Sequence, residues 1–384
     1  MRQVGILGIG QTKIDEHWDR SLRDLGVDAI RAAMEDGGRI TCDGLFVGNM
    51  LSGISNHQDL LGSLLSDWSD MQPVEAVKVE AACASGGAAF RSALMAVASG
   101  ELDSAMVVGV EKMTDSGSAQ ITAALATAAD ADNEVDQGVS FVGLNALIMQ
   151  RYMHEYGWKH TDFAPFSINS HANAVHNPCA RLRNRITLEQ YQKAVMVSAP
   201  INILDASPIG DGAAAILLVP IEDLPDRSKI IVCGSASFTD SLAIHDRSDA
   251  ITLRAAYRSA KSAYQQAKVQ ANNIDVFELH DAFSIMAALS LEACGFAEQG
   301  QGPRLALDGE IEPDGRIPIC TRGGLKARGH PVGATGVYQL VELVQQLRGE
   351  CGATQVEDAM TGMAQNIGGS GSTIVTHILK KTVI

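Results

Sequence analysis

A cysteine of this chain stands where its sulfur could act as a nucleophile. Cys83 lies between a predicted strand at residues 74–79 and a helical pattern that begins near Gly87. A cysteine directly before a helix faces free backbone N–H groups and the positive end of the helix dipole, which predicts a lowered thiol pKa. The alternative is a small cysteine buried in the core, which is the usual place of this residue type.

A histidine in a glycine-rich segment is the candidate for the matching base. His330 lies within residues 323–336, directly before another helical pattern. So many glycines predict a tight loop that aims the imidazole, which would take the proton of a cysteine and later return it. A histidine that caps a glycine-rich turn is the alternative. The segment lacks the GxxxxGK[ST] spacing of a phosphate loop.

A second histidine follows a predicted strand. His280 comes after the strand predicted at residues 276–279, and strand ends in α/β folds point the next residues into a ligand crevice. Its imidazole could donate a hydrogen bond to a developing enolate oxygen. The alternative is that Asp281 caps the following helix and His280 has no part in chemistry.

Another glycine-rich turn, residues 366–372, lies near the C-terminus. Backbone N–H groups around Gly368, together with Asn366, could hold an oxyanion. A plain hairpin between the last two strands fits the same residues.

The elements that must position these side chains alternate between strands and helices. Strands are expected at 4–8, 45–47, 74–79, 106–110, 213–219, 230–232, 275–279, 359–364 and 373–379, and helices at 22–34, 87–99, 253–267 and 336–347. The alternation predicts an α/β fold with a mainly parallel sheet. The similar order in the two halves, 1–225 and 226–384, predicts an internal duplication.

One long stretch does not fit the repeat. About 100 residues separate the strand at 106–110 from the next clear strand, too many for a crossover helix. We expect residues of about 115–200 to form an inserted subdomain over the active face. Its basic cluster, Arg181, Arg183 and Arg185, is either a solvated surface or a contact for substrate phosphates.

Composition narrows the classes of function. The 384 residues include 30 Lys and Arg against 45 Asp and Glu, a net charge of −15 that argues against a broad nucleic-acid-binding face. An apolar run long enough to cross a membrane is not expected, nor is a signal peptide. The seven cysteines form no CxxC pair, which favours reduced thiols in a cytoplasm and gives no reason to expect a bound metal.

Together these segments resemble the thiolase superfamily over nearly the whole chain. Cys83 falls on the family's nucleophile, and the run from Gly329 to Gly336, with His330, is similar to its histidine motif. Residues 211–215 and 177–187 also resemble family segments. The resemblance implies a duplicated five-layer αβαβα fold with an inserted loop domain. It also implies acyl transfer between coenzyme A thioesters through an acyl-cysteine, with no cofactor beyond these substrates.

Within that family, the sequence is most similar to the sterol-carrier-protein type and the archaeal type. Their mark is His-Asp-x-Phe, here residues 280–283. The archaeal resemblance implies synthesis of acetoacetyl-CoA from two acetyl-CoA and a homodimer or tetramer. It further implies assembly with a small zinc-containing OB-fold partner and with HMG-CoA synthase.

The chain departs from the family at the second catalytic cysteine. Biosynthetic thiolases place it in Cys-x-Gly, where this chain has Asn366, and the sterol-carrier type places it where this chain has Ala282. His280 or His330 must therefore remove the α-proton of the second acyl-CoA. Two alternatives follow: a ketoacyl-synthase-like or larger-substrate thiolase, and a thiolase-like acyl-CoA-binding subunit of low activity alone.

Overall fold

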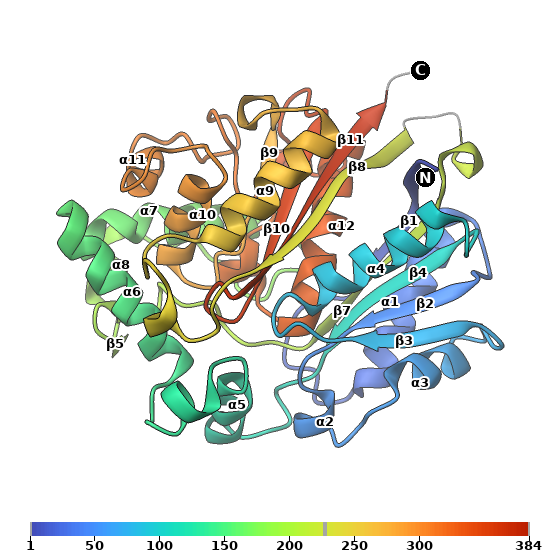
Figure 1. The fold of residues 1–384 in the computed structure, drawn as a ribbon, viewed down its shortest axis with the longest axis horizontal. Coiled ribbons are helices and arrows are strands. Elements are labelled where there is room, and N and C mark those ends of the chain that lie inside the picture. The colour runs from blue at the N-terminus through green and yellow to red at the C-terminus, as the bar shows by residue number, and fades with distance from the viewer. Residues whose placement is uncertain (1, 226–228, 383–384) are drawn as a thin grey trace.

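One nine-stranded sheet runs through the part of the chain described by this computed structural model, residues 2–225 and 229–382. Its strand order is β3-β2-β4-β7-β1-β8-β11-β10-β9 (Figure 1). The strands of the first half are β1 (Val4–Gln11), β2 (Gly44–Gly48), β3 (Glu75–Val79), β4 (Ala105–Glu111) and β7 (Gly212–Pro220). Those of the second half are β8 (Lys229–Thr239), β9 (Val276–Glu278), β10 (Thr361–Gly368) and β11 (Thr373–Thr382).

Helices cover the two half-sheets on both faces. Between the half-sheets lie α4 (Ser85–Ser99) and α12 (Thr335–Arg348), whose apolar residues share one core with the inner faces of both. The outer face of the first half packs against α1 (Leu22–Gly37) and α3 (Leu61–Trp68). The outer face of the second half packs against α9 (Arg254–Ala267) and α10 (Ser284–Ala293). The predicted five-layer α/β fold is confirmed.

The two half-sheets repeat one topology. The order β2-β4-β7-β1 of the first half matches β9-β10-β11-β8 of the second. The halves join where β1 meets β8 through the register pair Gly5–Ile231. In place of β3, the second half has an isolated bridge between Phe277 and Ile319. As a result, the loop before α4 and the loop before α12 occupy equivalent positions.

The prediction of a mainly parallel sheet is wrong. The pairs β2–β3, β2–β4 and β9–β10 are parallel, whereas β1–β7, β1–β8, β4–β7, β8–β11 and β10–β11 are antiparallel. The strand sequences misled because they are covered on both faces, and a strand covered on both faces loses its alternation whichever way its neighbour runs.

Between β4 and β7 the chain leaves the sheet and builds a mostly helical region. It contains α5 (Ser118–Ala126), α6 (Phe141–Tyr156), α7 (Ala164–Ala174), α8 (Leu188–Lys193) and the hairpin β5 (Met196–Ser198) and β6 (Ile201–Asn202). The limits of this region and of the halves stay predictions. The expected start of the second half at residue 226 falls on 226–228, outside the described residues.

Elsewhere the short helices α2 (Ser52–Ser55) and α11 (Gly302–Leu307) lie in connections. Within 2–225 and 229–382, no helix combines the length and the apolar character that crossing a membrane requires.

Candidate active site

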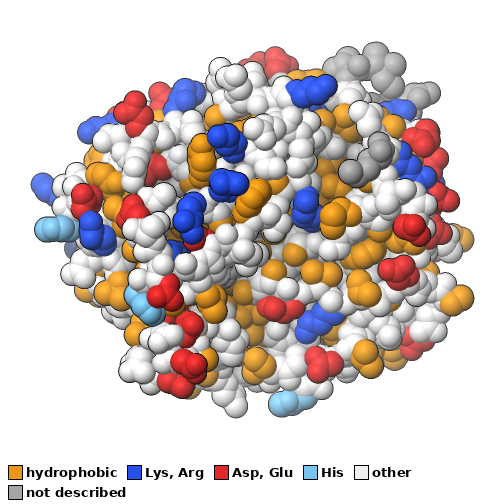
Figure 2. Space-filling model, in the orientation of Figure 1, with side chains coloured by type: hydrophobic (Ala, Val, Ile, Leu, Met, Phe, Trp, Pro, Cys, Tyr) orange, Lys and Arg blue, Asp and Glu red, His pale blue; other side chains and the backbone are white. Residues whose placement is uncertain are grey.

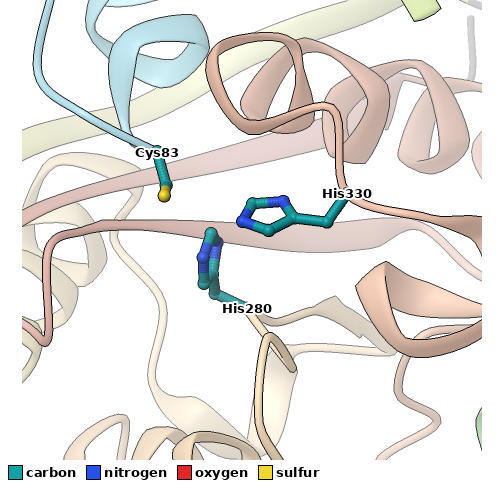
Figure 3. Close-up of side chains that lie close together, drawn as sticks. All are labelled: Cys83, His280 and His330. Carbon is teal, nitrogen blue, oxygen red and sulfur yellow. The ribbon is translucent and has the colours of Figure 1, made fainter. Parts of the chain in front are cut away.

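The three predicted catalytic side chains converge from distant parts of the sequence. Cys83 lies in the loop between β3 and α4, His280 follows β9, and His330 lies in the loop before α12. The sulfur and one nitrogen of each ring all lie within 4.8 Å of one another (Figure 3). The imidazole centroids are 5.2 Å apart, with the rings nearly perpendicular. The site therefore joins one group of the first half to two of the second.

A strained turn presents the cysteine. Ala82 has φ +50°, a left-handed conformation that costs free energy for a residue with a Cβ. Ser85 holds the turn, since its Oγ accepts from the Ala81 N–H at 2.9 Å and donates to the Ala82 carbonyl at 2.6 Å. This turn places Cys83 at the N-terminal end of α4, as the sequence predicts.

The helices that follow the two catalytic loops meet end to end. A Cβ on Gly86 would lie 2.9 Å from the Gly333 carbonyl oxygen, and one on Gly336 would lie 2.4 Å from the Gly87 nitrogen. No side chain fits between α4 and α12 at these positions. The close approach brings both helix N-termini, and the partial positive charge they carry, to the same place.

Hydrogen bonds define the tautomer of His330. Its Nδ1 lies 2.7 Å from Thr335 Oγ1, and that hydroxyl donates to the Pro331 carbonyl at 3.3 Å. Because the hydroxyl proton is directed at Pro331, Nδ1 carries the ring proton and donates it to Thr335. The Nε2 lone pair is then left for the site. Burial lowers the pKa of His330 to about 3, so the ring is neutral at neutral pH and can accept a proton.

His280 is held in the opposite tautomer. Its Nδ1 faces two N–H donors, the Asn366 side-chain amide at 3.2 Å and the Ile367 backbone at 3.3 Å. Nδ1 must accept from both, so Nε2 carries the proton. Burial, and then the neighbouring His330, lower the pKa of His280 far below its usual value. One imidazole is thus arranged as an acceptor and the other as a donor.

The expected thiolate at Cys83 is wrong for the resting site. Cys83 is 5% exposed, and burial together with the Glu111 carboxylate raises the pKa of its thiol to about 12. Loss of hydration disfavours the charged sulfur more than the helix end favours it. The resting pair is therefore a neutral thiol beside a neutral imidazole, and the thiolate forms only as its proton passes to a base.

The predicted oxyanion role of Asn366 does not fit its contacts. Its amide nitrogen donates to the Cys83 carbonyl at 3.0 Å and to His280, and its Oδ1 accepts from the Gly87 N–H at 3.1 Å. Both amide hydrogens are already engaged. Asn366 instead ties the cysteine loop and α4 to His280 of the other half.

Gly368 lies against the cysteine loop. A Cβ at this position would be 2.4 Å from the Ala81 carbonyl oxygen, so the backbone of β10 passes the loop at a distance only glycine permits. Its role as an oxyanion donor stays a prediction.

The three arginines of the basic cluster in the inserted region have separate surroundings. Arg181 pairs with Glu16, and Arg183 donates to the Val175 carbonyl at 3.2 Å. Arg185 borders a separate groove beside α7 and α11. The three side chains share no pocket with Cys83. Contact of these arginines with substrate phosphates stays a prediction.

Cys83, His280 and His330 are also residue types that can bind a metal ion. One sulfur and two imidazoles at this spacing resemble the ligands of zinc. His280 argues against such a site, because a metal on Nε2 would require the proton on Nδ1, against two N–H donors. These residues therefore fit proton transfer better than metal ligation.

A largely apolar pocket of about 250 Å³ contains the three side chains. Its walls come from α5, α6, α10 and the β10–β11 turn, and include Ile121, Leu125, Phe141, Phe283, Met286 and Ile367. Such walls exclude water and suit a short acyl chain beside the sulfur.

Sequence reasoning missed Glu111, which lies at the end of β4. Its buried carboxylate accepts from the Asn49 side chain at 2.8 Å, from the backbone of Met50 and Leu51 at 3.0 Å each, and from Gly333 at 2.9 Å. It thereby fastens the His330 loop to the first half. An acidic residue that ends an otherwise apolar strand was the available signal.

Comparison with known proteins agrees with this arrangement. The family described as "Thiolase, N-terminal domain" matches residues 4–199, and "Thiolase C-terminal domain-like" matches residues 236–381. The chain belongs to the thiolase family. The predicted resemblance and the class of enzyme, an acyltransferase, are thereby confirmed.

Several relatives of this thiolase align over its full length. An acetyl-CoA acetyltransferase of Methanothermobacter thermautotrophicus is 44% identical, with 99% of this chain and 100% of that protein covered. One of Methanocaldococcus jannaschii is 38% identical, with 99% of each covered. Among solved structures, "Ltp2-ChsH2(DUF35) aldolase" has a TM-score of 0.84 at 23% identity, covering 99% of this chain and 98% of that one. That likeness supports the fold.

Proposed function

We propose that this thiolase condenses two molecules of acetyl-CoA to acetoacetyl-CoA and CoA, or runs the reverse thiolysis, through an acyl-Cys83 intermediate. The observation that carries the proposal is the convergence of a cysteine with one acceptor imidazole and one donor imidazole in an apolar pocket. The full-length relatives named acetyl-CoA acetyltransferase support acetyl-CoA as the substrate.

In the first half-reaction, His330 Nε2 takes the thiol proton as the Cys83 sulfur attacks the thioester carbonyl. Concerted transfer suits a thiol of raised pKa, since no free thiolate need accumulate. The backbone N–H groups of Cys83 and Gly368 would hold the oxyanion. CoA leaves as a thiolate and receives the proton from His330.

In the second half-reaction, a second acetyl-CoA enters and its thioester oxygen meets the Nε2–H of His280. As the α-carbon loses its proton, negative charge grows on that oxygen, where the hydrogen bond strengthens. The enolate carbon attacks the acyl-Cys83 carbonyl. Collapse of the adduct releases acetoacetyl-CoA and the Cys83 sulfur. The chemistry needs no cofactor besides the CoA thioesters.

The test is a steady-state panel on the purified chain. Acetoacetyl-CoA thiolysis and acetyl-CoA condensation are expected, and both are expected to vanish in Cys83→Ala. Mass spectrometry should find one acetyl group on Cys83 after incubation with acetyl-CoA. Acyl transfer that persists in Cys83→Ala would overturn the proposal. Condensation with malonyl-CoA alone would favour the ketoacyl-synthase-like alternative, and brisk turnover only with longer 3-ketoacyl-CoA would favour the larger-substrate one.

We also propose that the thiolase is a homo-oligomer. Strand β3 is an edge of the nine-stranded sheet, with Val77 40% exposed, and an unpaired edge is a template for a strand of another copy. Charged side chains alternate with hydrophobic ones on the face that includes β3 and α4 (Figure 2). Light scattering of the purified chain would measure the oligomeric state.

A partner protein is a further proposal. The name "Ltp2-ChsH2(DUF35) aldolase" joins those of two proteins, which supports a search for a partner protein. The candidates are the small zinc-containing OB-fold protein and HMG-CoA synthase that the family resemblance implies. The kinetic panel should therefore be run with and without each candidate. Efficient turnover of the chain alone would remove the alternative of an acyl-CoA-binding subunit that is inactive by itself.

A further inference from the structure

We propose that His330 is the single base of both half-reactions, and that Asn366 is the positioning residue that enforces this by holding His280 as a permanent hydrogen-bond donor. The inference rests on the proposed function and deepens it. It assigns the proton transfer that the missing second thiol leaves open.

The first step concerns which groups could take the α-proton. Of the described residues that line the pocket, the titratable ones are Cys83, His280 and His330. Cys83 carries the acyl group at this stage, and a thioester sulfur is far too weakly basic to take the α-proton. The remaining second-half thiols nearest in sequence, Cys294 and Cys320, are buried in the core around α10 and do not border the pocket. Two imidazoles are left.

The second step excludes His280. A base needs a lone pair on the nitrogen that faces the substrate. The Asn366 amide and the Ile367 N–H both point at His280 Nδ1, at 3.2 and 3.3 Å, so the ring proton is on Nε2. Moving it to Nδ1 would set three N–H groups against one another in a buried site and leave two donors unsatisfied.

The orientation of the Asn366 amide is itself fixed from two sides. Its nitrogen also reaches the Cys83 carbonyl at 3.0 Å, and its oxygen receives the Gly87 N–H at 3.1 Å. A flipped amide would face a carbonyl with its oxygen and an N–H with its nitrogen. The donor face toward His280 therefore follows from the backbone of α4 and of the cysteine loop.

The third step is the proton balance with one base. In the acyl transfer, His330 takes the proton of Cys83 and gives it to the departing CoA thiolate, so the ring is neutral again. In the condensation, the same Nε2 takes the α-proton while the C–H electrons form the enolate, whose oxygen His280 holds. After the new C–C bond forms, the C–S bond to Cys83 breaks, and the sulfur takes the proton from His330. No second thiol is required.

The direct experiment reads the tautomers in the unmodified enzyme. With ¹⁵N-labelled histidine, NMR distinguishes a protonated from an unprotonated ring nitrogen, and His280→Gln and His330→Gln samples assign the signals. We expect His280 protonated on Nε2 and His330 on Nδ1 at pH 7. A proton on His280 Nδ1 would overturn the inference. Because no Asn366 variant is needed, the outcome does not depend on how such a variant folds.

A matched pair of variants tests the positioning residue. Asn366→Asp and Asn366→Ala both lose the donor to the Cys83 carbonyl, but Asp offers an acceptor to His280 Nδ1 and Ala leaves the Ile367 N–H there. We expect Asn366→Asp to move the His280 proton to Nδ1 and to slow deuterium uptake into the methyl group of acetyl-CoA in D₂O by roughly 10²-fold. Asn366→Ala should keep the proton on Nε2 and lose less than about tenfold. An unchanged NMR signature in Asn366→Asp, or equal losses in both variants, would contradict the role.

The half-reactions separate this inference from the proposed function. In this scheme, acetylation of Cys83 requires His330 but not His280, and its rate can be measured by mass spectrometry. We expect this rate in both Asn366 variants to stay within about tenfold of that of the unmodified enzyme. If the unmodified enzyme never acetylates Cys83, the proposed function fails. If it does, and His330→Gln still exchanges α-protons at the full rate, only the single-base inference fails.

Discussion

The two halves of this thiolase share a topology but contribute differently to the site. Each half places a loop before its central helix, α4 or α12, and the helices meet at their N-termini. The first-half loop carries Cys83, whereas the second half supplies both imidazoles, from the loop before α12 and from the end of β9. The two halves thus share a symmetric arrangement of strands and helices, whereas the catalytic side chains they carry are different.

The side chains that link the two halves by hydrogen bonds, Glu111 and Asn366, also differ in what they do. The carboxylate of Glu111 in the first half accepts the Gly333 N–H of the His330 loop, so its contact with the second half is to backbone. Asn366 of the second half reaches the Cys83 carbonyl and also sets the tautomer of His280. One tie therefore fixes geometry, and the other fixes geometry and proton location together.

Replacement of Cys83, the catalytic side chain from the first half, should have the largest effect on activity. Cys83→Ser keeps the shape of the site but replaces the sulfur with a far weaker nucleophile. We expect kcat for thiolysis to fall on the order of 10⁴-fold or more, with circular dichroism unchanged. A loss of less than tenfold would show that the first half supplies no nucleophile.

Removal of the donor imidazole should cost less. In His280→Ala the enolate oxygen loses one hydrogen bond, so we expect condensation to fall roughly 10²–10³-fold. Acetylation of Cys83 should change much less, because His330 and the backbone donors remain. Equal losses in both half-reactions would mean that the two imidazoles do not divide the work.

A third buried imidazole of the second half, His377, allows a test of how burial shifts a histidine pKa without a substitution among the catalytic side chains. In β11, His377 Nε2 donates to the Gly87 carbonyl at 3.1 Å, and the imidazole packs against Phe90. Burial lowers the pKa of His377 to about 3, whereas the pKa of a histidine in an unfolded chain is about 6.5. Below that pH the unfolded chain binds more protons, so the free energy of unfolding decreases as pH falls.

For one such histidine, the decrease between pH 7.5 and 5.5 is about 1.4 kcal/mol. His377→Phe removes the group, so its free energy of unfolding in urea should depend less on pH by that amount. The comparison is between slopes, which makes the variant's absolute stability irrelevant. Identical pH dependence in both proteins would show that folding does not lower the pKa of His377.

The smallest effect is expected at the basic cluster of the inserted region. Arg181 makes a partly exposed ion pair with Glu16, and such pairs contribute little. Arg181→Ala should change KM for acetyl-CoA by less than about twofold. A rise of tenfold or more would restore the cluster as a substrate contact and give the inserted region a share in binding.

Much of the frame could be predicted from sequence, because runs of helix-forming residues that end at a glycine leave a clear pattern. The helix predicted over 22–34 runs from Leu22 to Gly37, and the one predicted over 336–347 runs from Thr335 to Arg348. Cys83, His280 and His330 were recognisable because each lies at a junction of elements. Strand direction was not, since burial on both faces removes the alternation that would report it.

The remaining site features depend on contacts between distant segments. Nothing near Asn366 in sequence indicates that its amide faces Cys83 and His280, 283 and 86 residues away. The raised pKa of the Cys83 thiol likewise follows from tertiary burial, which outweighs the local helix end. Local pattern identified which residues to watch, and tertiary packing decided their protonation.

The apolar walls around Cys83 also bear on the lifetime of an acetylated enzyme. On the proposed mechanism, the apolar walls would shield a Cys83 thioester from hydrolysis, so the acetyl group would persist until an acceptor binds. The rate at which acetate is released by hydrolysis would then report the integrity of these walls more sensitively than the turnover rate does.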